Sequence, residues 1–263
     1  MNPIIYPFPH LPMLGKGSIL IDVFDSAGNP TGFQHLGNCT KMELTIKDDI
    51  AELFQSLNKS VSMIASALKK RSPMLAITGT DFSSSHIAIA HMGNLVPLVT
   101  TAATIAGEAL ASATATKKGK YFFTLGRNLS PTPTDTVVHQ ASATLVAGTD
   151  YVLIDPVSGC VFFPLTSAVV DTEAVSIDYK TVVGSLDQVN AATLPFINGK
   201  LKFQPDPTDG QKIGVDVWHF HMNPTGGTGL IADDYGNWQV DARILDDSAN
   251  HPTCPYFQET FYP

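Results

Sequence analysis

The amino-acid sequence predicts a mostly β protein, folded as a sandwich or barrel of antiparallel strands with one short helix. Apolar and polar residues alternate with a period of two along many short segments, which is the pattern of strands with one dry and one wet face. Turn residues separate these segments at intervals of roughly 8–12 residues, as in sandwiches and barrels. One segment carries the cap residues of a helix.

The segment 41–47 is the clearest of the early strands. Met42, Leu44 and Ile46 fall on one face, and charged or hydroxyl side chains fall on the other. After it, residues 48–58 fit a short helix or a loop, and residues 61–68 fit either a strand or a helix. The strands expected before the helix span residues 17–24, 41–47 and 73–78.

The helix is expected between residues 81 and 93. Asp81, Ser83 or Ser84 can cap its first turn, because their side-chain oxygens accept hydrogen bonds from free backbone N–H groups. Gly93 stands where a glycine commonly ends a helix. The helix is short and weakly amphipathic, so we expect it to flank a sheet.

The rest of the chain is expected to be strands and turns within one domain, 1–263. Asn198-Gly199 between apolar runs is a strong hairpin signal. The Ala/Thr-rich run 100–116 favours a surface insertion or elaboration within about 100–200, and residues 248–263 resemble an extended C-terminal arm. The further expected strands are 98–106, 120–125, 136–146, 151–154, 160–163, 174–181, 200–204, 213–222, 228–232 and 237–245.

The composition points away from nucleic-acid coating and towards broad protein contacts. Charged residues make up 15% of the 263 residues and the net charge is −8. A surface that neutralises phosphates needs clustered Lys and Arg, which an acidic chain of this kind lacks overall. Sparse charge suits contact between copies, because interface cores are depleted in charge; a Thr/Ser-rich β protein without such contacts explains it equally.

The chain shows no sign of a disulfide framework or of export. The three cysteines, Cys39, Cys160 and Cys254, are odd in number and far apart, so we expect free thiols in a reducing cytosol. The N-terminus has no basic region before its apolar residues, and no apolar run approaches the length of a membrane span. We therefore expect synthesis in the cytoplasm and no membrane.

Candidates for metal or catalytic chemistry are weak. His219 and His221 share one face of an expected strand and could hold a metal ion if further ligands joined them, but two polar surface positions explain them better. No nucleophile elbow, phosphate loop or other cofactor motif is present, so we expect no cofactor and no catalytic residues. Basic residues beside aromatics at 117–123 could bind single strands, although solvated loop ends are the simpler interpretation.

The order of three motifs resembles tail tube proteins of long-tailed bacteriophages. The first runs from the strand at Gly15–Asp22 through Leu36-Gly-Asn to the strand ending at Lys47, followed by a long loop or hairpin, a strand and a helix. The second is the hairpin Leu145–Phe162, and the third is the closing segment Leu230–Asp246 with Cys254-Pro-Tyr-Phe257. Gln258 stands where the family usually has a glycine.

The resemblance implies two packed β-sheets with a flanking helix, and hexameric rings that share one inner β-barrel. Stacked rings would form the tail tube through which DNA passes into the bacterium. The expected partners are further copies of the chain, the tail terminator, the baseplate or tip, and the tape-measure protein, with DNA passing without specific binding. The protein would then reside in the virion tail and would not be an enzyme.

Two sets of residues are candidates for roles in such a tube. Polar strand positions are expected to face the channel, where acidic groups repel phosphates. The apolar loop 48–72 and the C-terminal arm are expected to join successive rings, because exposed apolar runs mark interaction sites. The channel candidates are Lys41, Glu43, Thr45, Gln239, Asp241 and Arg243, and the inter-ring candidates are Val61, Met63, Ile64, Leu68, Tyr256 and Phe257.

Three other functions remain open at this level. The chain could be a carbohydrate- or receptor-binding sandwich of a phage tail, with Trp218, Trp238 and Tyr235 as a sugar platform. It could be a metal-dependent enzyme that uses His219 and His221. It could also be a tail terminator or baseplate ring protein, which closes into a ring without forming a filament.

Overall fold

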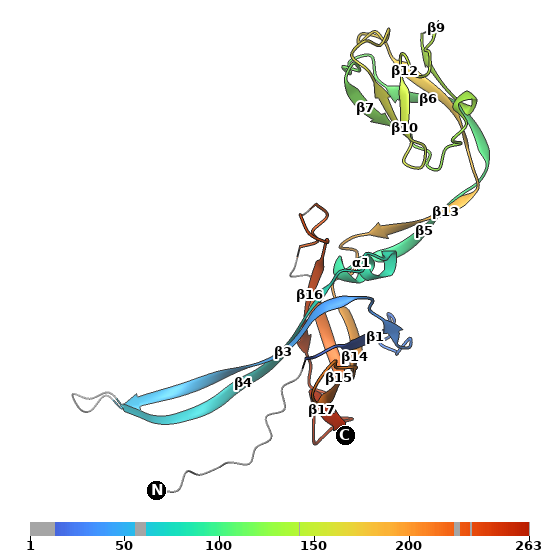
Figure 1. Ribbon diagram of the computed structural model, residues 1–263. Coiled ribbons are helices and arrows are strands. Elements are labelled where there is room, and N and C mark those ends of the chain that lie inside the picture. The colour runs from blue at the N-terminus through green and yellow to red at the C-terminus, as the bar shows by residue number, and fades with distance from the viewer. Residues whose placement is uncertain (1–13, 56–61, 142, 224–226, 232, 263) are drawn as a thin grey trace. The chain divides into compact units, whose positions relative to one another are not determined.

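The computed structural model describes residues 14–55, 62–141, 143–223, 227–231 and 233–262. It confirms a mostly β chain with antiparallel sheets and, in these ranges, a single α-helix. The chain divides into two compact units (Figure 1). Unit 1 comprises residues 1–95 and 189–263, and unit 2 comprises residues 96–188, which overlap most of the stretch of about 100–200 where the sequence suggests an insertion.

Unit 1 is built on one sheet of eight strands that encloses a core on its inner face. The strand order is β2-β1-β14-β15-β16-β4-β3, and β17 pairs with the other half of β15. Within the described residues no sheet closes on itself. The strands are β1 (Gly17–Val23), β2 (Gln34–His35), β3 (Cys39–Gln55), β4 (Ser62–Gly79), β14 (Ile197–Pro205), β15 (Lys212–Asn223), β16 (Trp238–Ile244) and β17 (Phe257–Tyr262).

The core of unit 1 is formed by alternate residues of these strands together with the helix. Trp238 is its largest member and is fully buried, with its indole N–H donating to the Asp81 carbonyl at 2.8 Å. Gly79 on the neighbouring strand leaves room for this ring, because a Cβ there would lie 2.1 Å from it. Trp238 therefore fixes how β16 and β4 pack.

Helix α1 (Ser84–Ala90) forms where the sequence predicts it. Ser83 is the N-cap, and its hydroxyl accepts a hydrogen bond from His86 N. At the other end the Gly93 N–H bonds back to the Ala88 carbonyl, which closes the last turn. The helix contributes Ile89 and Ala90 to the core of unit 1.

The loop after β1 is fastened by a buried carboxylate. Asp22 accepts hydrogen bonds from the backbone N–H groups of Thr31 and Gly32 at 2.8 and 2.9 Å, and Lys200 Nζ lies 3.3 Å away. Burial alone raises the pKa of Asp22, but these donors outweigh it and the pKa is lowered. Asp22 is thus an anion that stabilises the loop.

Unit 2 contains two sheets that share one core. The first has the order β6-β12-β8-β9 and the second β10-β11-β7. Val138 and Ile177 from the first and Val161 and Phe163 from the second are all fully buried in it. The elements are β6 (Ala103–Ala111), β7 (Lys120–Phe123), the 3₁₀ turn η1 (Pro133–Asp135), β8 (Thr136–Gln140), β9 (Ala143–Thr144), β10 (Val152–Asp155), β11 (Cys160–Phe163) and β12 (Val175–Thr181).

The chain crosses between the units in two paired strands, β5 (Asn94–Thr100) and β13 (Gly184–Asn190). At the unit 2 end of this ribbon, the Thr100 hydroxyl lies 3.2 Å from the Gly184 carbonyl oxygen, to which it donates. The chain therefore enters and leaves unit 2 at neighbouring points, as an inserted domain does.

Candidate functional site

One face of the unit 1 sheet collects the six channel candidates. β4 lies between β3 and β16, and three of its residues each pair with one candidate on either side. Thr78 pairs with Lys41 and Gln239, Ala76 with Glu43 and Asp241, and Met74 with Thr45 and Arg243. All six lie on the side away from the core, because the residues between them on β3 and β16 point inward. We call Lys41, Glu43, Thr45, Gln239, Asp241 and Arg243 the polar sheet face.

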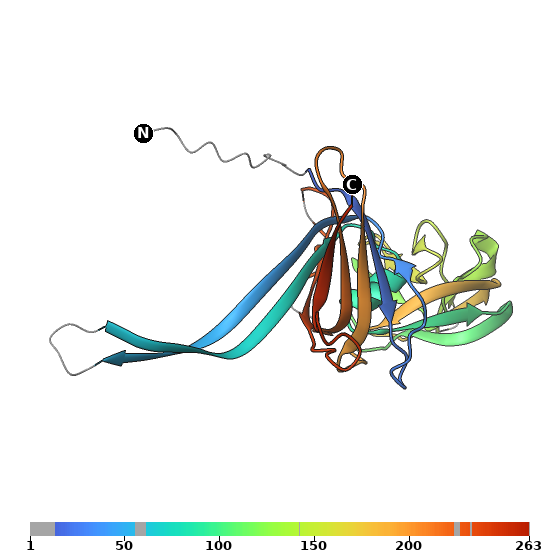
Figure 2. The ribbon, with the colours of Figure 1, turned by 90° about the horizontal axis from the view of Figure 1, so that it is seen from below.

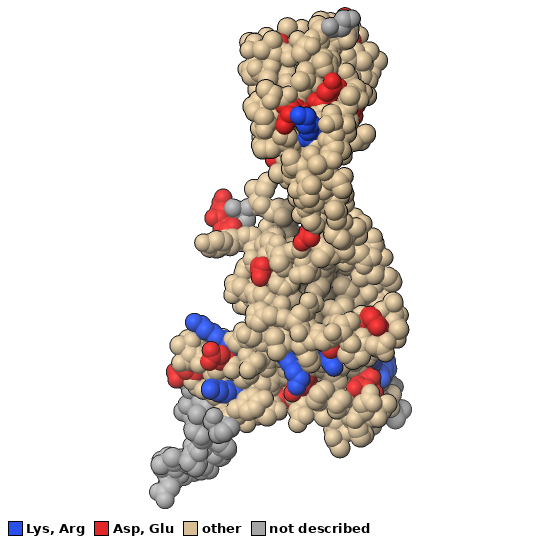
Figure 3. Space-filling model, turned by 90° about the vertical axis from the view of Figure 1, so that its right-hand side faces the viewer, with Lys and Arg blue, Asp and Glu red and all other residues tan. Residues whose placement is uncertain are grey.

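The polar sheet face carries balanced charge. Lys41 Nζ and Glu43 Oε2 are 2.6 Å apart, and this contact raises the pKa of Lys41 and lowers that of Glu43. Two cations and two carboxylates make its net charge zero, so it is mixed and not purely acidic. Figure 3 shows another view of the surface, in which basic and acidic side chains are likewise scattered and no extended positive patch is visible.

The most unusual feature of unit 1 is the length of the β3–β4 hairpin. The two strands pair from Cys39–Gly79 to Gln55–Ser62, but β16 pairs with β4 only from Met74 to Gly79. Among the described residues, therefore, no other strand lies beside the outer half of the hairpin, and this half projects from the sheet (Figures 1 and 2). The helix or loop interpretation of residues 48–55 is wrong, because these residues continue the strand.

The core-facing side of β3 continues along this projection without a covering layer. Ile46, Ile50 and Phe54 follow Met42 and Leu44 at alternate positions, and Leu68 and Met63 lie opposite Ile50 and Phe54 on β4. These side chains are about half exposed. We call Ile46, Ile50, Phe54, Met63 and Leu68 the hairpin stripe.

Two polar positions interrupt the hairpin stripe. Asp48 and Arg71 face each other across the hairpin in a bidentate ion pair with both distances at 2.9 Å, which lowers the pKa of Asp48. Glu52, opposite Ser66, has no ion pair within the described residues. The stripe thus presents apolar side chains around one unpaired carboxylate, a surface that soluble monomers seldom leave uncovered.

The inter-ring candidates separate into two groups. Met63 and Leu68 belong to the hairpin stripe, and Ile64, at a register shift of the same hairpin, is also exposed. Val61 lies outside the described residues. Tyr256 and Phe257 are half-buried against the core of their own unit, and Phe257–Tyr262 form β17, so the end of the expected extended arm is a strand of the unit 1 sheet.

The two histidines gain no third ligand. His221 Nδ1 lies 3.0 Å from Asn198 Oδ1, while the ring of His219 lies 5.7 Å from that of Phe24. Across the described part of the chain, no group of three or more His, Cys, Asp or Glu side chains is arranged to hold a metal ion. The geometry around His219 and His221 therefore does not support a metal site.

The expected sugar platform is not formed. Trp238 lies inside the core, and Trp218 stacks on His251 with ring centroids 3.9 Å apart while its N–H donates to the Cys254 carbonyl. Tyr235 is exposed alone. The alternative function required the three rings to share a surface. Trp238 instead belongs to the core of unit 1, and the half-buried Trp218 anchors the segment before β17.

Other reactive side chains are held in structural roles. Burial and the Asp81 carboxylate raise the pKa of the Cys39 thiol to about 11, so it stays protonated at neutral pH. Lys117, from the basic cluster considered for nucleic acid, is buried and donates to the carbonyls of Ala115 and Asp171 at 2.8 and 2.7 Å. Lys117 is thus unavailable to a phosphate.

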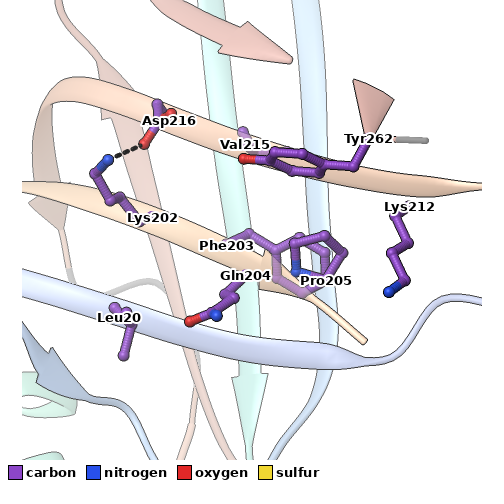
Figure 4. A pocket seen from close by; sticks show the side chains of 9 residues that line it. All are labelled: Leu20, Lys202, Phe203, Gln204, Pro205, Lys212, Val215, Asp216 and Tyr262. Carbon is purple, nitrogen blue, oxygen red and sulfur yellow. Dashed lines mark ion pairs between the residues drawn. The ribbon is translucent and has the colours of Figure 1, made fainter. Parts of the chain in front are cut away.

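A cavity of about 490 Å³ lies on the sheet between β14 and β17 (Figure 4). Leu20, Pro205 and the Tyr262 ring give it apolar walls. Lys202, paired with Asp216 at 2.9 Å, and Lys212 add charge. This cavity could not be predicted from the sequence, because the cavity forms only when the C-terminal strand pairs with β15.

The fold and these surfaces define a β protein with an inserted β domain, a projecting apolar hairpin and one polar sheet face. The chain belongs to the family described as protein of unknown function UCP028589, whose model matches residues 12–257. A comparison with curated proteins finds no match. No helix in the described ranges is long and apolar enough to cross a membrane.

Proposed function

We propose that this protein is the structural subunit of a bacteriophage tail tube, polymerising as stacked hexameric rings. The observation that carries the proposal is the hairpin stripe. Soluble monomers seldom leave a core-type surface of this kind exposed, and the motif order of the sequence resembles proteins that assemble from many copies of one chain.

The free strand edges of unit 1 support the same proposal. β3 and β17 each pair on one side only within the described chain. Such edges invite pairing with another chain, and ring closure removes them. In the proposed ring, inner strands of six copies join into one barrel, and the contact that stacks rings is repeated head to tail into an open-ended filament.

The polar sheet face would line the channel. Its alternating charges neutralise each other, so it offers no continuous positive track to phosphates. DNA could then slide past without specific binding. The tape-measure protein inside the tube, and the tail terminator and the baseplate or tip at its ends, would be the other partners, with the protein located in the virion tail.

Unit 2 would be an added surface domain, with its two sheets packed as a small sandwich. Its entry and exit through one ribbon allow such an insertion without disturbing the sheet that assembles. No step in the proposed function calls for a catalytic group or a cofactor.

Sedimentation velocity at increasing protein concentration tests the proposal. A tube subunit gives polymers that grow without a fixed size. A species that stops at one ring would instead indicate a tail terminator or baseplate ring protein. A monomer at every concentration would contradict assembly altogether.

A further inference from the structure

The cavity in Figure 4 has a composition that suits a particular kind of partner. The apolar part of its wall consists of Leu20 from β1, Pro205 from β14 and the Tyr262 ring from β17, and its polar part of Lys202, Gln204, Lys212 and Asp216. Its volume of about 490 Å³ is within the range of about 300–1,000 Å³ typical of binding sites. A wall that is partly apolar and partly charged suits a partner that offers both apolar and charged side chains.

The charge of the cavity is unbalanced. Lys202 is neutralised by Asp216 at 2.9 Å, whereas Lys212 has no ion pair within the described residues. Lys212 pairs with Tyr262 in the strand register, and both residues line the cavity. The matching partner is therefore apolar and carries one carboxylate.

The outer half of the hairpin has this composition. Ile50 and Phe54 flank Glu52 at alternate positions of β3, so all three side chains point to the same side. Glu52 is exposed and, like Lys212, lacks an ion pair within the described residues. One unpaired carboxylate among apolar side chains complements one unpaired ammonium group in a cavity whose wall is partly apolar.

The hairpin and the cavity that it fits belong to different copies. The outer half of the hairpin pairs only with itself and leads away from the sheet (Figure 2). A stripe that fits a cavity elsewhere on the same protein makes a head-to-tail contact, which propagates into a filament or ring.

We infer that the hairpin of one copy docks in the β14–β17 cavity of a second copy, with Glu52 facing Lys212. The inference rests on the proposed self-assembly and specifies its contact. It commits to another copy as the occupant because the apolar surfaces and the single charges match on both sides.

A charge exchange tests the pairing. Glu52→Lys and Lys212→Glu are each expected to raise the critical concentration for assembly about tenfold, since each juxtaposes like charges in a partly desolvated site. The double variant is expected to return close to the wild-type value. Asp49→Lys is the matched control, because Asp49 is exposed on the opposite face of the hairpin and should leave assembly unchanged.

A cross-link gives an independent readout. A photoreactive phenylalanine at position 54 should label peptides of β14 or β17, and a mixture of isotope-labelled and unlabelled copies should show that the link joins two chains. Two results would overturn the pairing while leaving the proposed function intact, provided that the wild-type protein polymerises. One is a double variant whose critical concentration stays as high as in the single variants, and the other is cross-linking of position 54 only to segments other than β14 and β17. A wild-type protein that never assembles would remove both.

Discussion

Removing the apolar character of the hairpin stripe should abolish assembly while leaving the fold intact. The perturbation is the triple variant Ile50→Ser, Phe54→Ser and Leu68→Ser. These side chains are 51%, 49% and 53% exposed in the single chain, so each has about half of its surface left to bury against a partner. They lie outside the two cores, and folding gains little from them.

The size of the effect follows from that exposure. Burying the remaining half of a large apolar side chain is worth about 1 kcal/mol. Three such losses weaken each contact by about 3 kcal/mol, which is roughly a hundredfold in the dissociation constant. Pelleting of polymers across a concentration series measures this shift, and circular dichroism melting checks the fold.

The same hairpin provides a matched control. Ala51, Ala65 and Ala67 lie on its opposite face, and their change to Ser adds the same three hydroxyl groups without touching the hairpin stripe. We expect the control to assemble like the wild type. Equal critical concentrations for the control and the stripe variant would refute the argument that exposed core-type surface drives assembly.

Three further predictions concern other parts of the molecule. Asp22→Ala should cost about 2 kcal/mol at neutral pH, because it removes the charged acceptor of two backbone hydrogen bonds. Since the folded pKa of Asp22 is lowered, its stabilisation holds above the unfolded value of about 3.9 and fades as pH falls. The variant should therefore show a flatter acid dependence in melting experiments, and an unchanged acid dependence would contradict the role of this anion. Changing Glu43 and Asp241 to Lys should leave assembly intact but slow DNA ejection from reconstituted particles, and unchanged ejection kinetics would argue against the polar sheet face as the channel lining. Replacing residues 101–183 with an Asn-Gly turn should yield a folded unit 1 that still assembles, whereas loss of folding would show that unit 2 is not an independent insertion.

The sequence predicts most strands and the helix because those signals are local. Alternation identifies β16, and Ser83 with Gly93 identifies α1. The outer hairpin is harder, because Asp48 and Glu52 interrupt the apolar alternation and suggest a loop. The even positions from Met42 to Phe54 do carry the signal, and counting them across the two acids would have extended the strand.

Other features depend on distant parts of the chain. In the sequence, the segment that forms β17 resembles an extended arm, because prolines precede it. It becomes a strand because it pairs with residues 212–217 of β15. The boundary of unit 2 lies inside paired strands, so no linker composition marks it. The aromatic platform is not formed because Trp218 and Trp238 pack against residues far away in the sequence. A local sequence pattern does not reveal such contacts.

Electron microscopy of the purified protein at high concentration tests the central claim most directly. The account predicts hollow tubes of uniform diameter with six copies in each ring, and their loss in the triple serine variant of the hairpin stripe. Small particles at every concentration, with the hairpin intact, would contradict the proposal that this protein builds a tube.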